Sequence, residues 1–230
     1  MQISIHQPNY FPWLGYFYKI INSDIFVFLD NVQYSKGSYT NRTKLSINDS
    51  IKWITLPIKY KFGTNINNIE VLNNKWKLEH LNKLHFYYSK SKFYKEIWPL
   101  ANSIYMNNKE IKLSEINIFF IKKIIEYFEI NVKLYKSSEI LIKTNLYGDD
   151  RLIELIKNIS GVDTYISGNG ALDYQSEEKF NLHNIKVKYT PKAFSSYNQQ
   201  GNINFIPGLS ILDCLFNIGK KDTLKLLQEK

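Results

Sequence analysis

The first thirty residues constrain the fold of this chain more than any other stretch. A short segment of strand character, residues 3–7, ends in His6 and Gln7, and a second one, residues 24–29, ends at Asp30. Two prolines exclude a regular helix directly after the first segment, but aromatic and aliphatic residues at helical spacing follow them. Strand, helix and strand in so short a stretch predict a parallel βαβ unit, whose second strand is almost wholly apolar because both of its faces are buried.

The same alternation returns in the second half of the chain, where residues 132–135, 164–167 and 185–189 have strand character. Between the two halves lie three segments with helical periodicity, which we expect to form a helical insertion or subdomain at residues 72–130. The sequence therefore predicts a single domain, residues 1–230. Its fold class is α/β, with a mostly parallel, Rossmann-like sheet and a helical insertion in the middle.

Cysteine content and apolar runs bear on the compartment. Cys214 is the single cysteine, so no internal disulfide is possible, which favours a reducing environment. The N-terminal residues lack the basic and long apolar regions of a signal peptide, and no apolar run approaches the ~20 residues of a membrane-spanning helix. We therefore expect a cytoplasmic protein without a membrane span, and the sequence makes no prediction of its oligomeric state.

The net charge of +9 indicates an anionic partner, such as nucleic acid, a nucleotide-linked substrate or a membrane surface. A plainer explanation is that lysine simply fills the surface of a chain rich in Lys, Asn and Ile, as an AT-biased genome would encode. The 17 tyrosines and 14 phenylalanines are harder to explain in this way. Many of them stand beside polar residues, where ring faces line sites for sugars or bases.

Polar residues follow both N-terminal strands, and in open parallel sheets ligands bind at the carboxyl ends of the strands. His6 at such an edge suits a base or a phosphate ligand, and the alternative is a satisfied buried donor. Asp30 suits a base, a substrate anchor or an indirect metal ligand, and the alternative is a cap on the following turn. Arg42 is one of only two arginines, and we predict that it shares one pocket with His6 and Asp30.

Two further groups of residues have the chemistry of anion binding. Lys36, Asn41, Arg42 and Lys44 follow the second strand and could hold a phosphate or carboxylate, although a solvated basic face is the alternative. Residues 167–170 follow a later strand. Their backbone N–H groups could cradle a phosphate, but they match neither glycine-rich nucleotide motif, so a tight turn is the alternative.

No metal site is predicted. His80 and His85 are five residues apart, which does not match the spacing of zinc-binding helices, and the chain has no cluster of Cys and His. Cys214 lies in an apolar helical segment, where an inert buried thiol is expected.

A longer motif in the N-terminal segment resembles the WbqC-like family. Its residues are His6-Gln7-Pro8, Tyr10, Pro12-Trp13 and Gly15-Tyr16-Phe17, followed by Asp24 to Asp30, Gln33-Tyr34, Asn41-Arg42 and Trp53 with Pro57. Weaker matches extend to the C-terminus. Members of this family are encoded in bacterial O-antigen and surface-polysaccharide gene clusters, and the activity proposed for them is glycine transfer onto the amino group of an amino sugar.

A fainter likeness links the same opening to pantothenate synthetases and other nucleotidyl-transferring enzymes with an HxGH motif, which implies a nucleotidyltransferase-like sheet. The positions of the two motif histidines read Trp13-Leu14-Gly15-Tyr16 here. Because neither histidine is present, adenylate chemistry does not follow from this likeness.

Together with the candidate residues above, the resemblance implies a transferase of O-antigen or lipopolysaccharide biosynthesis. It would form an amide between the glycyl group of a donor and a nucleotide-linked amino sugar. The donor could be activated by ATP or carried by tRNA. A glycosyltransferase or other sugar-nucleotide enzyme is an alternative, although no Asp-x-Asp motif is present, and so is a non-catalytic sugar or nucleic-acid binding module. The predicted catalytic residues are His6, Asp30 and Arg42. The predicted substrate-binding residues are Gln7, Tyr10, Trp13, Lys36, Asn41, Lys44, Gly168, Asn169, Gly170 and Tyr174.

Overall fold

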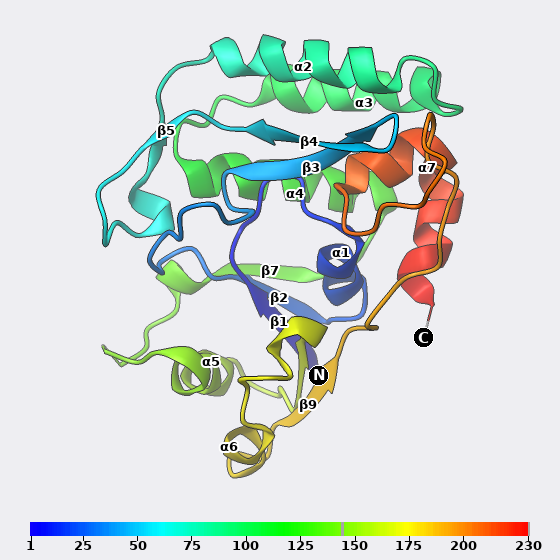
Figure 1. Cartoon of the computed structure of the whole chain (residues 1–230). Helices are drawn as coiled ribbons and strands as arrows, with labels where there is room; N and C mark the ends of the chain where they lie inside the picture. Colours follow the sequence, from blue (N-terminus) through cyan, green and yellow to red (C-terminus); the bar gives the residue numbers. More distant parts are fainter. Residues whose placement is uncertain (144, 230) are drawn as a thin grey trace.

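The computed structural model describes residues 1–143 and 145–229 and has a five-stranded parallel sheet at its centre (Figure 1). The strands lie in the order β7-β2-β1-β8-β9, and each neighbouring pair is parallel. This confirms the predicted α/β class and the Rossmann-like sheet. The five strands are β1 (Gln2–His6), β2 (Ile25–Phe28), β7 (Lys133–Lys136), β8 (Thr164–Ser167) and β9 (Lys186–Tyr189).

The strand order reverses direction at β1. Along the chain, the connections run from β1 through β2 to β7 on one side, and then return to β8 and β9 on the other. Backbone pairing between β1 and β8 covers only Gln2 and Ile3, and beyond it the Ser4 hydroxyl donates to the Ile166 carbonyl at 3.1 Å. A sheet of this order leaves a crevice between the two central strands at their carboxyl ends.

Both faces of the sheet are covered. On one face, Phe26 and Phe28 pack in a core shared with α1 (Leu14–Ile21), α4 (Leu113–Phe128) and α7 (Ile211–Gln228). On the other face, Ile25 and Val27 pack in a smaller core shared with α5 (Gly148–Lys157) and α6 (Glu177–Asn181). This two-sided burial explains why β2 is apolar at every position.

The connection from β2 to β7 holds a helical block and small antiparallel ladders. The helices are α2 (Lys75–Tyr88), α3 (Tyr94–Asn107) and α4, and the ladders are β3 (Arg42–Ile47) with β4 (Ser50–Thr55) and β5 (Ile58–Lys59) with β6 (Glu70–Val71). The Asn117 amide of α4 donates to the Pro8 and Thr40 carbonyls, at 2.8 and 2.7 Å, and so ties this block to the loop after β1. That residues 72–130 form a subdomain stays a prediction.

The β3–β4 hairpin has an inner and an outer face. Leu45 and Ile54 are fully buried on the inner face. By the two-residue alternation of strands, Arg42, Lys44 and Trp53 point to the opposite, outer face. The hairpin lies between α2 and the central sheet (Figure 1).

The chain from residue 190 to residue 209, here called the strap, runs from β9 to α7 without regular structure. Ser210 then caps α7, accepting from the Leu212 N–H at 3.3 Å. Within α7, Gly219 adopts φ 73°, and a Cβ there would lie 2.6 Å from the Phe93 ring, so only glycine fits. The remaining short 3₁₀ turns are at Ile66–Asn68, Ser137–Glu139 and Asn169–Ala171.

In the part of the chain that the structure describes, no helix is both long and apolar enough to cross a bilayer.

Candidate functional site

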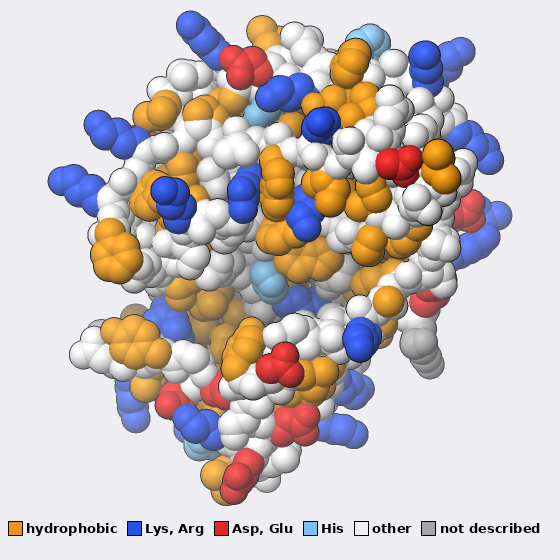
Figure 2. All heavy atoms as spheres, in the orientation of Figure 1, with side chains coloured by type: hydrophobic (Ala, Val, Ile, Leu, Met, Phe, Trp, Pro, Cys, Tyr) orange, Lys and Arg blue, Asp and Glu red, His pale blue; other side chains and the backbone are white. Residues whose placement is uncertain are grey.

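Two adjoining cavities open at the carboxyl ends of β1 and β8, where the strand order reverses. One, of about 650 Å³, is lined mainly by the strap and the start of α1, and we call it the strap chamber. The other, of about 540 Å³, is lined by the start of α5 and the segment after β8, and we call it the α5 chamber. Figure 2 shows the surface hollowed between the hairpin side of the molecule and the α5–α6 side. The residues that line both chambers are His6, Trp13, Lys19, Gly168 and Gly170.

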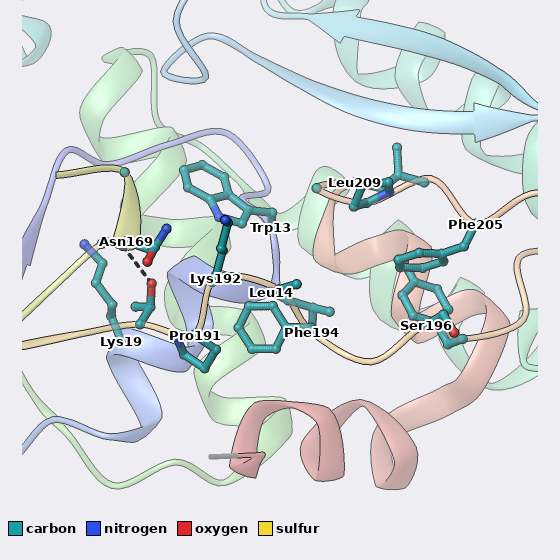
Figure 3. A pocket seen from close by; sticks show the side chains of 18 of the residues that line it. Trp13, Leu14, Lys19, Asn169, Pro191, Lys192, Phe194, Ser196, Phe205 and Leu209 are labelled. Carbon is teal, nitrogen blue, oxygen red and sulfur yellow. Dashed lines mark hydrogen bonds between the residues drawn. The ribbon is translucent and has the colours of Figure 1, made fainter. Parts of the chain in front are cut away.

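The strap chamber has an aromatic wall. The labelled side chains of Trp13, Phe194 and Phe205 flank it in Figure 3. Its floor includes Leu14 and Gly15 of α1, a helix that begins here without a side-chain cap. An uncapped first turn offers N–H groups and a partial positive charge to an anion.

Gly15 is required by a close approach within this wall. A Cβ at this position would lie 2.9 Å from Trp13 Nε1. The glycine therefore lets the indole lie against the first turn of α1, where it lines both chambers. The group that approaches the backbone of Gly15 is thus the indole of Trp13.

His6 ends β1 with its ring among aromatic neighbours, 4.8 Å from the Tyr16 ring and 5.8 Å from the Trp13 ring. Its Nδ1 lies 3.1 Å from the Gln7 carbonyl. A carbonyl only accepts, so Nδ1 carries the proton and Nε2 keeps its lone pair in the neutral ring. Burial, reinforced by the nearby Lys19, lowers the pKa of His6 to about 3. The imidazole is therefore a neutral acceptor at pH 7.

Lys19 is the functional candidate that reasoning from the sequence missed. It lies on α1 with 3% of its surface exposed, and its ammonium donates to the Ile5 carbonyl at 3.3 Å. It makes no ion pair with any described residue, and burial lowers its pKa to about 7. Its only sequence signal is its place four residues after Gly15, on the apolar face of the helix. Buried lysines without a counter-ion are uncommon outside functional sites.

The segment after β8 lines the cleft, but one of its backbone N–H groups is occupied within the protein. The Asn169 N–H donates to Thr190 Oγ1 at 3.0 Å (dashed in Figure 3). At Gly168 and Gly170, by contrast, an added Cβ would meet nothing within 4 Å, so the backbone there borders open space. Tyr174 is 78% exposed at the α5 chamber.

Gln7 also lines the α5 chamber. Its side-chain oxygen accepts from the Thr40 hydroxyl at 3.4 Å, while its amide nitrogen makes no hydrogen bond with the described residues. Of the predicted site residues, the structure thus brings together His6, Gln7, Trp13, Gly168, Asn169, Gly170 and Tyr174.

The predicted pocket of His6, Asp30 and Arg42 is not formed, because Asp30 and Arg42 line neither chamber. The Asp30 carboxylate is 1% exposed and accepts from the Ser138 N–H at 2.9 Å and the Ser138 hydroxyl at 2.6 Å. It joins the end of β2 to the turn after β7. Arg42 lies on the hairpin's outer face, stacked on Trp53 and bonded to the Gly37 carbonyl.

Tyr10 and Asn41 lie in the interior instead of at the cleft. The Tyr10 hydroxyl is hydrogen-bonded to His80 Nδ1 at 2.7 Å and to the Tyr105 hydroxyl at 2.8 Å. The Asn41 side chain accepts from the Tyr34 hydroxyl and donates to the Leu56 carbonyl. Lys36 and Lys44 line neither chamber: Lys36 is exposed on a loop, and Lys44 lies beside Arg42 on the hairpin.

Across residues 1–143 and 145–229, no group of three or more His, Cys, Asp and Glu side chains is placed to hold a metal ion.

Comparison with known proteins gives one family match and one relative. The model of the WbqC-like protein family matches residues 7–225. A protein of Mycobacterium tuberculosis (strain ATCC 25618 / H37Rv), named Uncharacterized protein Rv1507c, is 30% identical over 221 residues, which cover 95% of this chain and 94% of the relative. No solved structure matches the chain at a comparable level.

Replacing Asp30 tests whether its carboxylate is structural. Asp30→Ala removes the acceptor of the buried Ser137 hydroxyl and of the Ser138 N–H and hydroxyl, and we expect it to lower the free energy of unfolding by about 2–4 kcal/mol in urea titrations. Glu139→Ala, in the same turn but with a 63% exposed side chain, is the control and should change it by less than about 0.5 kcal/mol. Unchanged stability in Asp30→Ala would contradict the structural role.

Replacing Lys19 tests its burial through pH. Between pH 7 and its ordinary pKa of 10.5, the unfolded chain binds a proton at Lys19 that the folded chain does not, so stability rises with pH in this window. Lys19→Met should remove that rise and be more stable than the wild type at pH 7. Urea unfolding at pH 7 and pH 9.5 measures this, with the exposed Lys122→Met as the control. Equal pH slopes in wild type and Lys19→Met would refute it.

Proposed function

This chain belongs to the WbqC-like protein family, and from that premise we propose that its cleft transfers an aminoacyl group, glycyl first among them, to a nucleotide-linked amino sugar as an amide. The family suggests a role in O-antigen cluster biosynthesis. The observation that carries the proposal is the pair of chambers that share His6 and Lys19, because a transferase must bring two substrates to one point.

The proposed step needs a base for the attacking amine. The amine nitrogen forms a bond to the acyl carbon, the bond from that carbon to the leaving oxygen breaks, and the amine loses one proton. Lys19, with a pKa of about 7, is neutral often enough at pH 7 to take this proton, whereas His6, with a pKa of about 3, is too weak a base. His6 Nε2 instead accepts a hydrogen bond from the amine and orients it.

The developing negative charge needs hydrogen-bond donors. The uncapped start of α1 borders the strap chamber and supplies a positive helix end. The open backbone at Gly168 and Gly170, which line both chambers, admits a substrate close to the main chain. The aromatic rings of Trp13 and Tyr174 offer faces to a sugar or base.

The proposal is tested by mass spectrometry. A panel of nucleotide-linked amino sugars is incubated with the protein and glycine plus ATP, or with glycyl-tRNA. A mass gain of one glycyl unit, released as free glycine by amide hydrolysis, is the expected result. If no mass gain is seen with either donor, but an amino sugar nucleotide binds in calorimetry, the protein is a binding module and not an enzyme.

The base assignment predicts a pH-rate profile. The single-turnover rate should rise through about pH 7 as Lys19 loses its proton. Lys19→Met should lower the rate by about 100-fold or more and remove this rise, because no other side chain that lines both chambers titrates near pH 7. Lys122→Met on the surface of α4 is the matched control. A Lys19→Met enzyme with the wild-type profile would contradict the assignment.

A further inference from the structure

The outer face of the β3–β4 hairpin carries aromatic rings and cations together. We call Tyr39, Arg42, Lys44 and Trp53 the hairpin platform. Trp53 is 36% exposed, and none of the four residues lines either chamber. Figure 2 shows hydrophobic and basic side chains gathered over β3, directly above the hollow.

The rings of the platform form a continuous row that leads into the cleft. The Trp53 and Tyr39 rings are 5.5 Å apart, Tyr39 and Trp13 are 5.0 Å apart, and Trp13 and His6 are 5.8 Å apart between centroids. The Trp53–Tyr39 and Tyr39–Trp13 ring pairs are each tilted by 52°. Because Trp13 lines both chambers, a ligand following the row reaches the shared residues.

The cations of the platform are not neutralised by the protein. The Arg42 guanidinium lies 4.1 Å from the Trp53 ring centroid, and the Lys44 ammonium lies 5.4 Å from that ring. Neither makes an ion pair with a described residue. Asp49, in the turn of the hairpin, is bonded to the N–H groups of residues 203 and 204. The platform therefore presents unpaired positive charge.

Folding alone does not account for these rings. The hairpin already buries an apolar inner face through Leu45 and Ile54, both fully buried. The strap packs on the outer face at Ser46, which is bonded to Asn202, whereas Trp53 is 36% exposed. The solvent-exposed part of a sheet face is ordinarily polar. Rings interleaved with cations are instead the usual surface for single-stranded nucleic acid, where bases stack and phosphates pair with Lys and Arg.

We propose that the hairpin platform binds the single-stranded 3′ end of an RNA and directs it into the cleft. Resting on the proposed function, this makes the aminoacyl donor an ester of that RNA's terminal ribose. In the transfer, the acyl carbon gains a bond to the sugar amine, the ester bond to the ribose oxygen breaks, and the amine proton ends on that oxygen. A row of rings outside the chambers suits several successive bases, whereas a sugar nucleotide carries only one.

Binding to a labelled single-stranded RNA of about six nucleotides ending in CCA, followed by fluorescence anisotropy, tests the platform without any reaction. Trp53→Ala and Tyr39→Ala should each weaken binding by about 5- to 100-fold. Arg42→Gln with Lys44→Gln should also reduce the slope of log K against log salt by about 1.4, the value for two phosphates of a single strand. Lys52→Gln is the matched control: Lys52 is an exposed cation of the same hairpin, on β4, whose position alternates to the other face, and its replacement should change affinity less than twofold.

Further binding measurements decide whether the platform binds a single-stranded nucleic acid or a single nucleotide. A blunt duplex of the same sequence should bind more weakly, because its bases are already stacked. UMP, AMP or a sugar nucleotide binding as tightly as the RNA would overturn the proposal in favour of a mononucleotide site, and so would unchanged RNA affinity in Trp53→Ala shown to be folded by circular dichroism. If RNA binding depends on the platform but glycine and ATP alone support glycyl transfer, the RNA is not the donor. The proposed function would then still stand. RNA binding with no transfer from any donor would count against the proposed function itself.

Discussion

The early end of the ladder between β1 and β8 is the constraint on which the rest of the site depends. Because the connections leave β1 in one direction and β8 in the other, no helix crosses over the gap between their carboxyl ends. Backbone pairing between them stops at Ile3, and beyond it the Ser4 hydroxyl donates a hydrogen bond to the Ile166 carbonyl. The segments that follow β1 and β8, which start at Gln7 and Gly168, therefore line the cleft.

The residues that line both chambers include one buried lysine and one imidazole but no carboxylate. Burying Lys19 lowers the stability of the folded protein, as its lowered pKa indicates. Such a destabilising group is retained at sites where it has a function. The carboxylate that is fully buried nearby serves another purpose. Asp213 accepts from the Tyr88 and Tyr197 hydroxyls at 2.8 and 2.7 Å, and so anchors the strap that forms the outer wall. Burial raises the pKa of Asp213 to about 6.

The fold was predictable because its signals are local. Alternation of strand and helix, an apolar β2 and three periodic helices in the middle are properties of contiguous residues. The site was predictable only in part. His6 and Asp30 carry the same sequence signal, a polar residue at the end of an apolar strand, yet one faces the cleft and the other is held by Ser138. Which of them stays free depends on β7, a strand more than a hundred residues away from either in the chain.

By itself, the amino-acid order determined the parallel βαβ start, the helical block and the presence of His6 and Gln7 at the carboxyl edge, since strand and helix periods and proline stereochemistry act within a few residues. Tertiary structure alone decided the rest. In the tertiary structure Lys19 is buried, and Tyr10 and Asn41 lie in the interior. The rings of Trp13, Tyr39 and Trp53 lie in one row. The physical reason is that burial, pKa and ring contacts depend on which surfaces meet in space, and these surfaces come from segments far apart in the chain.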